Sequence, residues 1–400
     1  MKILVLNCGS SSIKYALYDM DGKQVITSGG IEKIGLPDSF IKIKLADGKK
    51  VQLDRPIAEH TAGVKFIFEV LSTGPWAVLS DLHEIDAVGH RMVHGGERFN
   101  KSVVLDDEVM AAFTACNDLA PLHNPANIKG VNAVKELLPK VPQVGVFDTA
   151  FHQTMPDYAY MYAVPYELYE KYGVRRYGFH GTSHRYVSHR VCEYLGLDPG
   201  HTKIITCHIG NGASMAAVKD GKVIDTSMGL TPLEGLIMGT RSGDIDAGAV
   251  TFIMDKEGLD TQGISNLLNK KSGLLGISGG KSDFRDILAA IAEGNDHARL
   301  AKEMYTYRIK KYIGQYAAAM GGVDVIVFTG GAGENQWEVR EGATKNLEFL
   351  GVMVDVEKNH ACRATEMTIS TDDSRVKVCV IPTDEELMIA TDTLALTAGC

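Results

Sequence analysis

Two segments of the chain, residues 3–28 and 203–228, repeat one pattern of apolar runs and small-residue turns. Each contains an apolar strand, a turn of small residues, a second strand, an Asp-Gly turn and a third strand. Small residues in the first turn allow backbone N–H groups to approach an anion closely. The repetition predicts two related domains whose loops face each other across a cleft. Such loops could hold a polyphosphate, as transfer of a phosphoryl group from a nucleotide requires.

The first loop, NCGSSSIK at residues 7–14, differs from the ordinary P-loop. It lacks the G-x-x-x-x-G-K-S/T spacing, and a P-loop leads from a strand into a helix. Here one set of residues, Ile13, Tyr15 and Leu17, alternates with another, Lys14, Ala16 and Tyr18. This period of two indicates that the chain continues as a strand. Hairpin turns are therefore predicted to hold the phosphates, which is the plan of the actin-like ATPase fold.

The composition is typical of a globular enzyme, with 45% hydrophobic and 23% charged residues in a chain of 400. The net charge is −9 and no basic run is interleaved with aromatic residues, which argues against nucleic acid as a partner. No stretch reaches the length of a membrane span, and Ile3–Leu6 is too short for a signal-peptide core. Seven cysteines without a C-x-x-C pair fit a reducing cytosol. We therefore expect a cytoplasmic protein that binds no membrane.

Helical and strand patterns alternate after each repeat. Helices are predicted near residues 106–120, 125–138, 183–195, 284–293 and 297–320, and buried strands at 144–148 and 323–331. Three strands followed by alternating helices and strands, twice over, predict an α/β fold of duplicated ribonuclease-H-like domains around a central cleft. Each domain would be a mixed sheet with flanking helices. The last helix could cross back, so we predict one domain at 1–149 plus 385–400 and another at 150–384.

Two arginines stand in glycine-rich segments of different predicted domains. Arg91 lies in AVGHRMVHGGERF and Arg241 in LEGLIMGTRSGDIDAG. A guanidinium group can make two parallel bonds to a carboxylate or phosphate, although an isolated arginine more often forms a surface ion pair. Two arginines in similar settings favour clamps on the oxygens of a transferring phosphoryl group.

His180 and Asp148 are further candidates. The spacing of His180 and His184 resembles a zinc pair, but no Glu follows His180, and Thr182 or Ser183 is predicted to cap a helix that begins at His184. His180 is then a loop donor to a phosphoryl group, or simply a hydrogen-bonded loop histidine. Asp148 follows a strand, where α/β folds place ligands. It could be a general base, a metal ligand or a turn former.

Three more segments break their local pattern. VIVFTGGAGEN at 325–335 opens from a strand into a glycine-rich turn, which could admit an adenosine or simply lead into a helix. SDFRD at 282–286 could contact a base or ribose, or be a helix start capped by Ser282. In IPTDEEL, Thr383 and Glu386 have the spacing of a capping box. The capping box explains Glu386 but not Glu385, which could bind Mg²⁺ directly or through water.

With these motifs in view, the chain resembles the acetate kinase family, the ATP-dependent carboxylate kinases of the acetate and sugar kinase, heat-shock chaperone and actin superfamily. The resemblance runs nearly end to end through LNCGSSS-x-K, GHR-x-VHGG, FDTAFH, RRYGFHGTSH, HIGNGAS, GTRSGD-x-D, TGG-x-GEN and IPT-x-EEL. It implies reversible, Mg²⁺-dependent phosphoryl transfer from ATP to acetate, giving acetyl phosphate and ADP, with Mn²⁺ as a possible substitute metal. It also implies a homodimer.

The resemblance assigns roles to individual residues. Asn7 and Glu385 are implied as Mg²⁺ ligands and Asp148 as the catalytic acidic residue. Arg91 and Arg241 would clamp acyl and phosphoryl oxygens while His180 donates to the transition state. The methyl pocket would be lined by Val93, Leu122, Phe179 and Pro232, beside Arg91. The implied nucleotide-binding residues are Ser10, Ser12, Lys14, His208, Ile209, Gly210, Asn211, Gly212, Asp283, Phe284, Arg285, Gly331, Ala332, Gly333, Glu334 and Asn335.

Other acceptors and other classes of protein remain alternatives. A carboxylate is already ionised at neutral pH and needs no base, whereas a sugar or glycerol hydroxyl would need Asp148 as general base. Pocket depth decides between acetate, propionate and butyrate, because each methylene is worth only about 1–3 kcal/mol. Direct in-line transfer is expected, with a phospho-Glu385 intermediate as the alternative. An ATPase switch would need an appended binding domain, and a nuclease a carboxylate where Asn7 stands.

Overall fold

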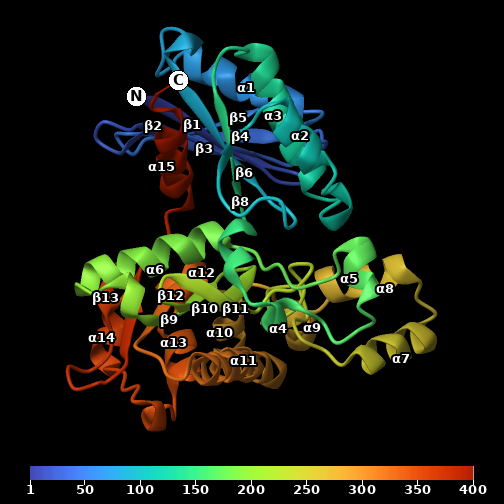
Figure 1. The fold of residues 1–400 in the computed structure, drawn as a ribbon, viewed down its shortest axis with the longest axis vertical. Coiled ribbons are helices and arrows are strands. Elements are labelled where there is room, and N and C mark those ends of the chain that lie inside the picture. The colour runs from blue at the N-terminus through green and yellow to red at the C-terminus, as the bar shows by residue number, and fades with distance from the viewer. Residues whose placement is uncertain (400) are drawn as a thin grey trace. The chain divides into compact units, whose positions relative to one another are not determined.

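The computed structural model describes residues 1–399. The chain forms two compact units (Figure 1). The first unit contains Met1–Phe151 and the chain from Asp384 onward, and the second contains His152–Thr383. Each unit is built on one mixed β-sheet with helices packed on it.

The sheet of the first unit has eight strands in the order β5-β4-β3-β2-β1-β6-β8-β7. Strands β1 to β5 pair antiparallel in sequence order, and β6 and β8 run parallel to β1. The strands are β1 Lys2–Cys8, β2 Ile13–Asp19, β3 Gln24–Glu32, β4 Phe40–Leu45, β5 Lys50–Asp54, β6 Ala87–Met92, β7 Val103–Val104 and β8 Gln143–Phe147.

Helices cover both faces of this sheet because the side chains of β1 alternate between them. Leu4 and Leu6 belong to a core shared with α1 (His60–Ser72) and α3 (Asn124–Leu137). Ile3 and Val5 pack with residues of α15 (Glu385–Thr397) in a second core. The last helix of the chain therefore completes the unit in which the chain begins.

The sheet of the second unit has six strands in the order β11-β10-β9-β12-β14-β13. The succession β11-β10-β9-β12-β14 repeats β3-β2-β1-β6-β8, with three antiparallel strands followed by two parallel ones. The predicted duplication of an α/β fold with mixed sheets is therefore confirmed. The strands are β9 Lys203–Ile209, β10 Ala213–Lys219, β11 Lys222–Thr226, β12 Val325–Thr329, β13 Met367–Thr368 and β14 Lys377–Val380.

The helix starts show three errors of prediction, all in the capping residue. Helix α6 (Gly181–Leu195) begins before His184, so neither Thr182 nor Ser183 is its cap. Asp283, and not Ser282, caps α10 (Phe284–Ala292). Asp384 caps α15 by accepting from the Leu387 N–H at 2.9 Å, so the predicted Thr383–Glu386 capping box is wrong. Where an aspartate directly followed the predicted cap, its side chain capped the helix.

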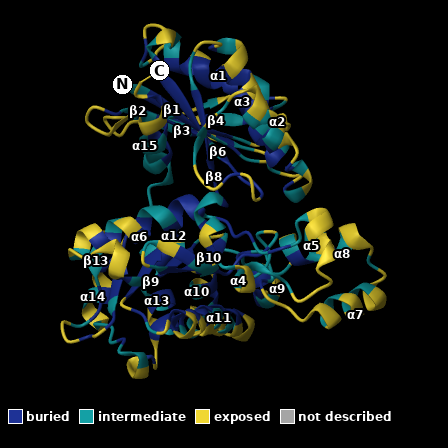
Figure 2. Cartoon of the chain, viewed as in Figure 1, coloured by how far each residue is buried: buried dark blue, intermediate teal, exposed yellow. Residues whose placement is uncertain are grey.

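Burial follows the layers, with dark strands and exposed outer helix faces (Figure 2). The region between β11 and α10 contains short helices that the sequence patterns had not suggested. None of the helices within residues 1–399 is long and apolar enough to cross a membrane. The remaining helices are α2 Asp107–Thr114, α4 Asp157–Tyr160, α5 Glu167–Tyr172, α7 Ala247–Glu257, α8 Thr261–Lys270, α9 Gly273–Ser278, α11 Asp296–Met320, α12 Gly330–Asn335, α13 Trp337–Thr344 and α14 Val356–Ala361.

Candidate active site

In the first unit, Arg91 on β6 and Asp148 after β8 form an ion pair. The Arg91 Nε donates to Asp148 Oδ1 at 2.9 Å, and Nη2 donates to Oδ2 at 2.6 Å. The Asp148 side chain is 1% exposed and that of Arg91 26%. The Asp148 carboxylate raises the pKa of Arg91 well above its usual value. This bidentate pairing fixes a permanently charged guanidinium group at the ends of two parallel strands.

A cavity of about 110 Å³ lies beside Arg91 within the first unit. The predicted Asn7, at the end of β1, and Glu385, the first residue of α15, both line it. Burial raises the pKa of Glu385 to about 7, even though Arg91 and Lys14 favour its charged form. The complete lining is Val5, Asn7, Lys14, Arg91, Glu385, Glu386 and Ile389.

The residues of this cavity fit Mg²⁺. The Asn7 amide and the Glu385 carboxylate offer hard oxygen donors, and Mg²⁺ needs few of these because it keeps several waters. The raised pKa of Glu385 indicates that the neighbouring cations do not fully compensate its negative charge. A divalent cation in the cavity would supply that compensation. No group of three or more His, Cys, Asp or Glu side chains in residues 1–399 is arranged to hold a metal ion, so the fit rests on this mixed donor set.

The first predicted phosphate turn joins β1 to β2. Its Gly9 N–H donates to the Ser12 carbonyl at 2.8 Å, and Ser10 is exposed. Lys14 lies opposite Asn7 in the β1–β2 register, and its side chain is exposed. The turn is therefore open to a ligand at the same strand ends as Asn7.

Two asparagines of α3, which the sequence analysis missed, fix the loops of the first unit. Asn127 Oδ1 accepts from the Val93 N–H at 3.0 Å, and its Nδ2 donates to the Cys8 carbonyl at 2.9 Å. Asn124 Oδ1 accepts from the His94 N–H at 3.1 Å. These contacts tie the segment after Arg91 to the end of β1. The only signal in the sequence was the NPAN run at the start of a helix.

In the second unit, His180 occupies the N-cap position of α6 in a left-handed conformation, with φ 56° and ψ 23°. Non-glycine residues adopt this conformation rarely, and mostly where the surroundings enforce it. Its Nδ1 contacts Ser214 Oγ at 2.9 Å, and its ring stacks on that of His208 at 4.3 Å. An ideal Cβ on Gly212 would lie 3.6 Å from both His180 Nε2 and Arg241 Nη1. The second predicted phosphate turn therefore lies close to the predicted histidine and arginine.

Arg241 differs from Arg91 in having only neutral partners. Its Nη1 donates to the Pro232 carbonyl at 3.0 Å and contacts Met238 Sδ at 3.6 Å. Across residues 1–399, no carboxylate lies within ion-pair distance of Arg241. Burial lowers the pKa of its guanidinium group. The side chain is therefore a partly desolvated cation without an internal counter-ion.

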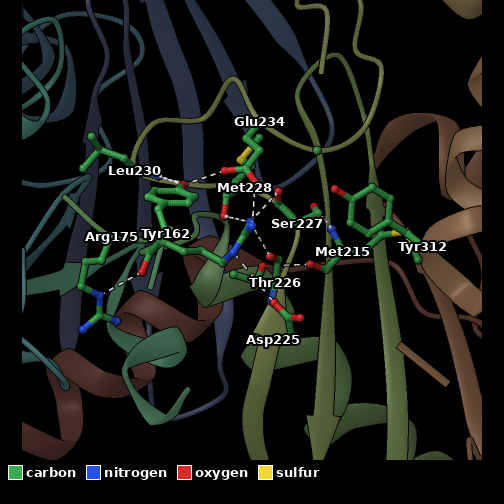
Figure 3. Close-up of polar contacts among 12 residues, drawn as sticks. Tyr162, Arg175, Met215, Asp225, Thr226, Ser227, Met228, Leu230, Glu234 and Tyr312 are labelled. Carbon is green, nitrogen blue, oxygen red and sulfur yellow. Dashed lines mark hydrogen bonds and ion pairs between the residues drawn. The ribbon is translucent and has the colours of Figure 1, made fainter. Parts of the chain in front are cut away.

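A partly buried polar cluster holds the loop that carries Pro232 and Arg241 (Figure 3). Arg176 Nη1 donates to the three carbonyls of residues 226–228 at 3.0–3.1 Å, and Nη2 donates to Glu234 Oε1 at 2.6 Å. The Tyr162 hydroxyl donates to Glu234 Oε2 at 2.6 Å and accepts from the Leu230 N–H at 3.0 Å. Hydrogen bonds to charged groups are among the stronger ones in proteins.

The same loop is closed at a second point. Asp244 Oδ1 accepts from the Gly235 N–H at 2.8 Å, and the Tyr312 hydroxyl donates to Asp244 Oδ2 at 2.7 Å. Gly235 has φ 107°, and a Cβ there would lie 2.6 Å from the Ser227 carbonyl oxygen. Only glycine suits this position. A long loop without helix or strand is thus given one defined conformation around Arg241.

A cavity of about 570 Å³ in the second unit gathers the three predicted nucleotide segments. Of the predicted residues it contains Gly210, Asn211, Asp283, Phe284, Arg285, Gly331, Ala332 and Asn335. His208, Ile209, Gly212, Gly333 and Glu334 do not line it. The cavity also contains Ser282 of the predicted SDFRD segment, and it adds four residues that the sequence analysis missed, namely Gly239, Leu274, Tyr305 and Gln336.

Glu334 and Arg340 do not line this cavity, but they bond the backbone of its glycine-rich segment. Glu334 Oε1 accepts from the backbone N–H groups of Gly330 and Thr383 at 2.9 and 3.1 Å. Arg340 is fully buried and donates to the carbonyls of Gly333 and Glu334 at 2.9 and 3.0 Å, at the end of α12. Burial lowers the pKa of Arg340 to about 10. Both side chains shape the glycine-rich segment.

The four predicted methyl-pocket residues are divided between the units. Val93 and Phe179 are buried, whereas Leu122 is 69% exposed. Val93 and Leu122 belong to the first unit, and Phe179 and Pro232 to the second. Neither unit alone contains all four predicted residues.

Comparisons with known proteins find related proteins that match nearly the whole length of the chain. The acetokinase family model matches residues 2–391. An acetate kinase of Bacteroides thetaiotaomicron is 71% identical over 394 residues, covering 98% of this chain and 99% of that protein. The crystal structure of Porphyromonas gingivalis acetate kinase has a TM-score of 0.96 at 59% identity, covering 99% of both chains. A Francisella tularensis propionate kinase has a TM-score of 0.91 at 43% identity, also covering 99% of both chains. The chain therefore belongs to the acetokinase family.

Proposed function

We propose that this enzyme transfers the γ-phosphoryl group of ATP to acetate, giving acetyl phosphate and ADP, in a reversible reaction. The observation that carries the proposal is the setting of Arg241. Its cation has no internal counter-ion, and together with His180 it meets the turn that leads into the 570 Å³ cavity. Transfer of a phosphoryl group requires neutralisation of its oxygens more than any covalent help.

The first unit would bind the acyl substrate and the metal. Arg91, oriented by Asp148, presents a fixed cation to the acetate carboxylate. Asn7 and Glu385 would hold Mg²⁺, which when bound neutralises phosphate charge. Mn²⁺ would fit the same oxygen donors. Because acetate is already ionised at neutral pH, Asp148 serves here to orient Arg91 and not as a base.

The second unit would bind ATP and receive the developing charge. The cavity formed by the segments around 210, 283 and 331 would hold the nucleotide, and Lys14, Ser10 and Ser12 of the first unit would contribute to phosphate binding. His180 Nε2 and Arg241 Nη1 would donate to the oxygens of the transferring group. Donors fixed before the reaction stabilise such charge without reorganisation cost. These groups would allow the phosphoryl group to pass directly from ATP to acetate, so no phosphorylated Glu385 is needed.

A hydroxyl acceptor such as glycerol is disfavoured by Asp148 itself. Both of its carboxylate oxygens accept from Arg91, and its side chain is 1% exposed. A general base must reach the proton that it takes. We further propose that the protein acts in the cytoplasm as a homodimer, which light scattering of the purified protein would test.

The proposal is tested by trapping the product. The purified protein is incubated with ATP, Mg²⁺ and hydroxylamine, and with acetate, propionate, butyrate or glycerol in separate reactions. We expect coloured hydroxamate from acetate, less from propionate and least from butyrate, with matching ADP release. Release of ADP with glycerol and no hydroxamate from any acid would overturn the assignment. Inversion at a chiral phosphorus would support direct transfer, and retention would support the phospho-Glu385 route.

A further inference from the structure

A chain of four side chains runs from the core of the second unit to His180. Thr206 Oγ1 on β9 lies 2.7 Å from His184 Nδ1, and His184 Nε2 lies 2.8 Å from Ser214 Oγ on β10. Ser214 Oγ in turn lies 2.9 Å from His180 Nδ1. Thr206, Ser214 and His184 are fully buried. We call this chain the histidine relay.

The single hydroxyl proton of Ser214 couples the two histidines. Ser214 Oγ contacts a nitrogen of each imidazole and can donate to only one of them. The other nitrogen must then carry a proton and donate to Ser214. The relay can therefore run in one of two directions, and each direction places the proton of a neutral His180 on a different nitrogen.

Thr206 decides between the directions. Its hydroxyl lies 2.7 Å from His184 Nδ1 but 3.4 Å from the Ala216 carbonyl, which is the other acceptor within reach. Hydroxyl hydrogen bonds are normally 2.5–3.0 Å long, so the Thr206 proton goes to His184 Nδ1. His184 then donates from Nε2 to Ser214, and Ser214 donates to His180 Nδ1. A neutral His180 is left with its proton on Nε2, the nitrogen near Gly212 and Arg241.

We propose that His180 works as a neutral imidazole with its proton on Nε2, and that Ser214 and His184 are positioning residues that hold it in this tautomer. The catalytic use of that proton rests on the proposed function, whereas the tautomer itself does not. In this state His180 donates to a phosphoryl oxygen without having to carry a positive charge. Neutral histidines serve as hydrogen-bond donors in other active sites.

The surroundings of His180 oppose a second proton. A proton on Nδ1 would make both histidines donors to Ser214, and the Ser214 hydroxyl would lose its acceptor. The groups near His180 include the Arg241 cation on its loop, His208 stacked from β9, and His184 from α6, which reaches it through Ser214. Burial lowers the pKa of His184 well below its usual value, and the nearby His152 and His208 add to this. The hydrogen bonds of the relay therefore favour a single proton on each histidine.

Nitrogen NMR of the full-length protein tests the tautomer directly. Histidine labelled with ¹⁵N shows from its two ring-nitrogen shifts which nitrogen carries the proton. His180 signals are assigned by their loss in His180→Asn. We expect the neutral Nε2–H form for both His180 and His184 between pH 7 and pH 8. An imidazolium or an Nδ1–H tautomer at His180 in this range would overturn the proposal.

Three variants test the positioning residues. Ser214→Ala breaks the relay, His184→Leu removes donor and acceptor, and His184→Gln keeps one of each. Ser188→Ala is the matched control, because it removes a buried hydroxyl from the same helix outside the relay. A wrong histidine tautomer costs on the order of 10⁴ in rate where it has been tested in a protease triad. We expect kcat losses of about tenfold or more for Ser214→Ala and His184→Leu, a smaller loss for His184→Gln, and an unchanged KM for ATP.

The readouts separate this inference from the proposed function. If His180 has the expected tautomer but His180→Asn keeps full turnover, the tautomer stands and the catalytic role fails. If Ser214→Ala keeps both the wild-type tautomer and the wild-type kcat, the positioning role is overturned. Equal losses in His184→Gln and His184→Leu with the tautomer unchanged would also overturn it, because packing alone would then explain them.

Discussion

Arg91 and Arg241 were predicted as equivalent clamps, but their electrostatic settings are opposite. Arg91 donates two hydrogen bonds to the buried Asp148, and that carboxylate raises its pKa. Arg241 contacts a carbonyl and a thioether, and burial lowers its pKa. The first cation is balanced before any ligand arrives, whereas the second is not.

The difference teaches that one residue type can be prepared for anions in two ways. A paired arginine keeps a fixed orientation, but the negative charge of its partner offsets part of its electrostatic field. An unpaired arginine keeps its full field in a partly desolvated setting, where an incoming anion gains most. Here the unpaired arginine lies with His180 near the turn at Gly212, which suits the more highly charged phosphoryl group.

The largest expected effect comes from removing each cation. Arg91→Met and Arg241→Met should each lower kcat by on the order of 10²–10³, the usual cost of losing one such donor. Only Arg91→Met should also destabilise the fold, by about 3–5 kcal/mol, because it leaves Asp148 buried and unpaired. Acyl-phosphate assays and urea unfolding measure the two quantities. Equal losses of stability in both variants would contradict the comparison.

The next effect concerns the partner of Arg91. If unpaired charge is what destabilises Arg91→Met, then adding Asp148→Asn should restore about 2 kcal/mol or more of its lost stability. Activity should not return, since the clamp is still missing. A double-mutant cycle by urea unfolding gives the coupling free energy. Coupling below about 0.5 kcal/mol would mean that the pair contributes orientation alone.

A smaller effect should follow from loosening the loop around Arg241. Glu234→Gln keeps the shape of the side chain but weakens the bonds from Arg176 and Tyr162 (Figure 3). Losing charge assistance costs about 1–2 kcal/mol, so kcat should fall about tenfold while the Kd for ADP stays the same. Glu193→Gln, at an exposed helix pair, is the control. A rise in the Kd for ADP equal to the loss of kcat would show a general disturbance of the unit.

The smallest effect is a pH dependence in the first unit. The pKa of Glu385 is raised to about 7, above its unfolded value of about 4.3. Its contribution to stability is therefore complete at low pH and is lost as the pH rises toward 7. Mg²⁺ should restore it, so the Mg²⁺-induced rise in Tm should be larger at pH 8 than at pH 5.5. In Glu385→Gln this difference should vanish; a persistent difference would place the metal elsewhere.

The fold could be predicted because its signal is repeated. Two copies of the same strand pattern, each followed by parallel strands, leave few topologies open. Helix starts were predicted less well, because a cap depends on a single side chain and its neighbour competes for it. Asp283 and Asp384 displaced Ser282 and Thr383 in this way.

The residues that position other site residues could not be predicted from the sequence. Ser214 meets His180 only because β10 pairs with β9 and α6 packs on that sheet. Arg176 and Glu234 lie 58 positions apart and are joined by the fold alone. Contacts of this kind depend on register and packing, which local patterns do not contain.

The return of α15 to the first unit has a consequence for how the protein is made. On the ribosome, β1 and its neighbouring strands emerge early, but the helix that covers Ile3 and Val5 is translated only after the whole second unit. Until then one apolar sheet face has no cover, and Glu385 has not been synthesised. The nascent chain must stay soluble in this state, so we expect its need for chaperones to end only when the last helix leaves the exit tunnel.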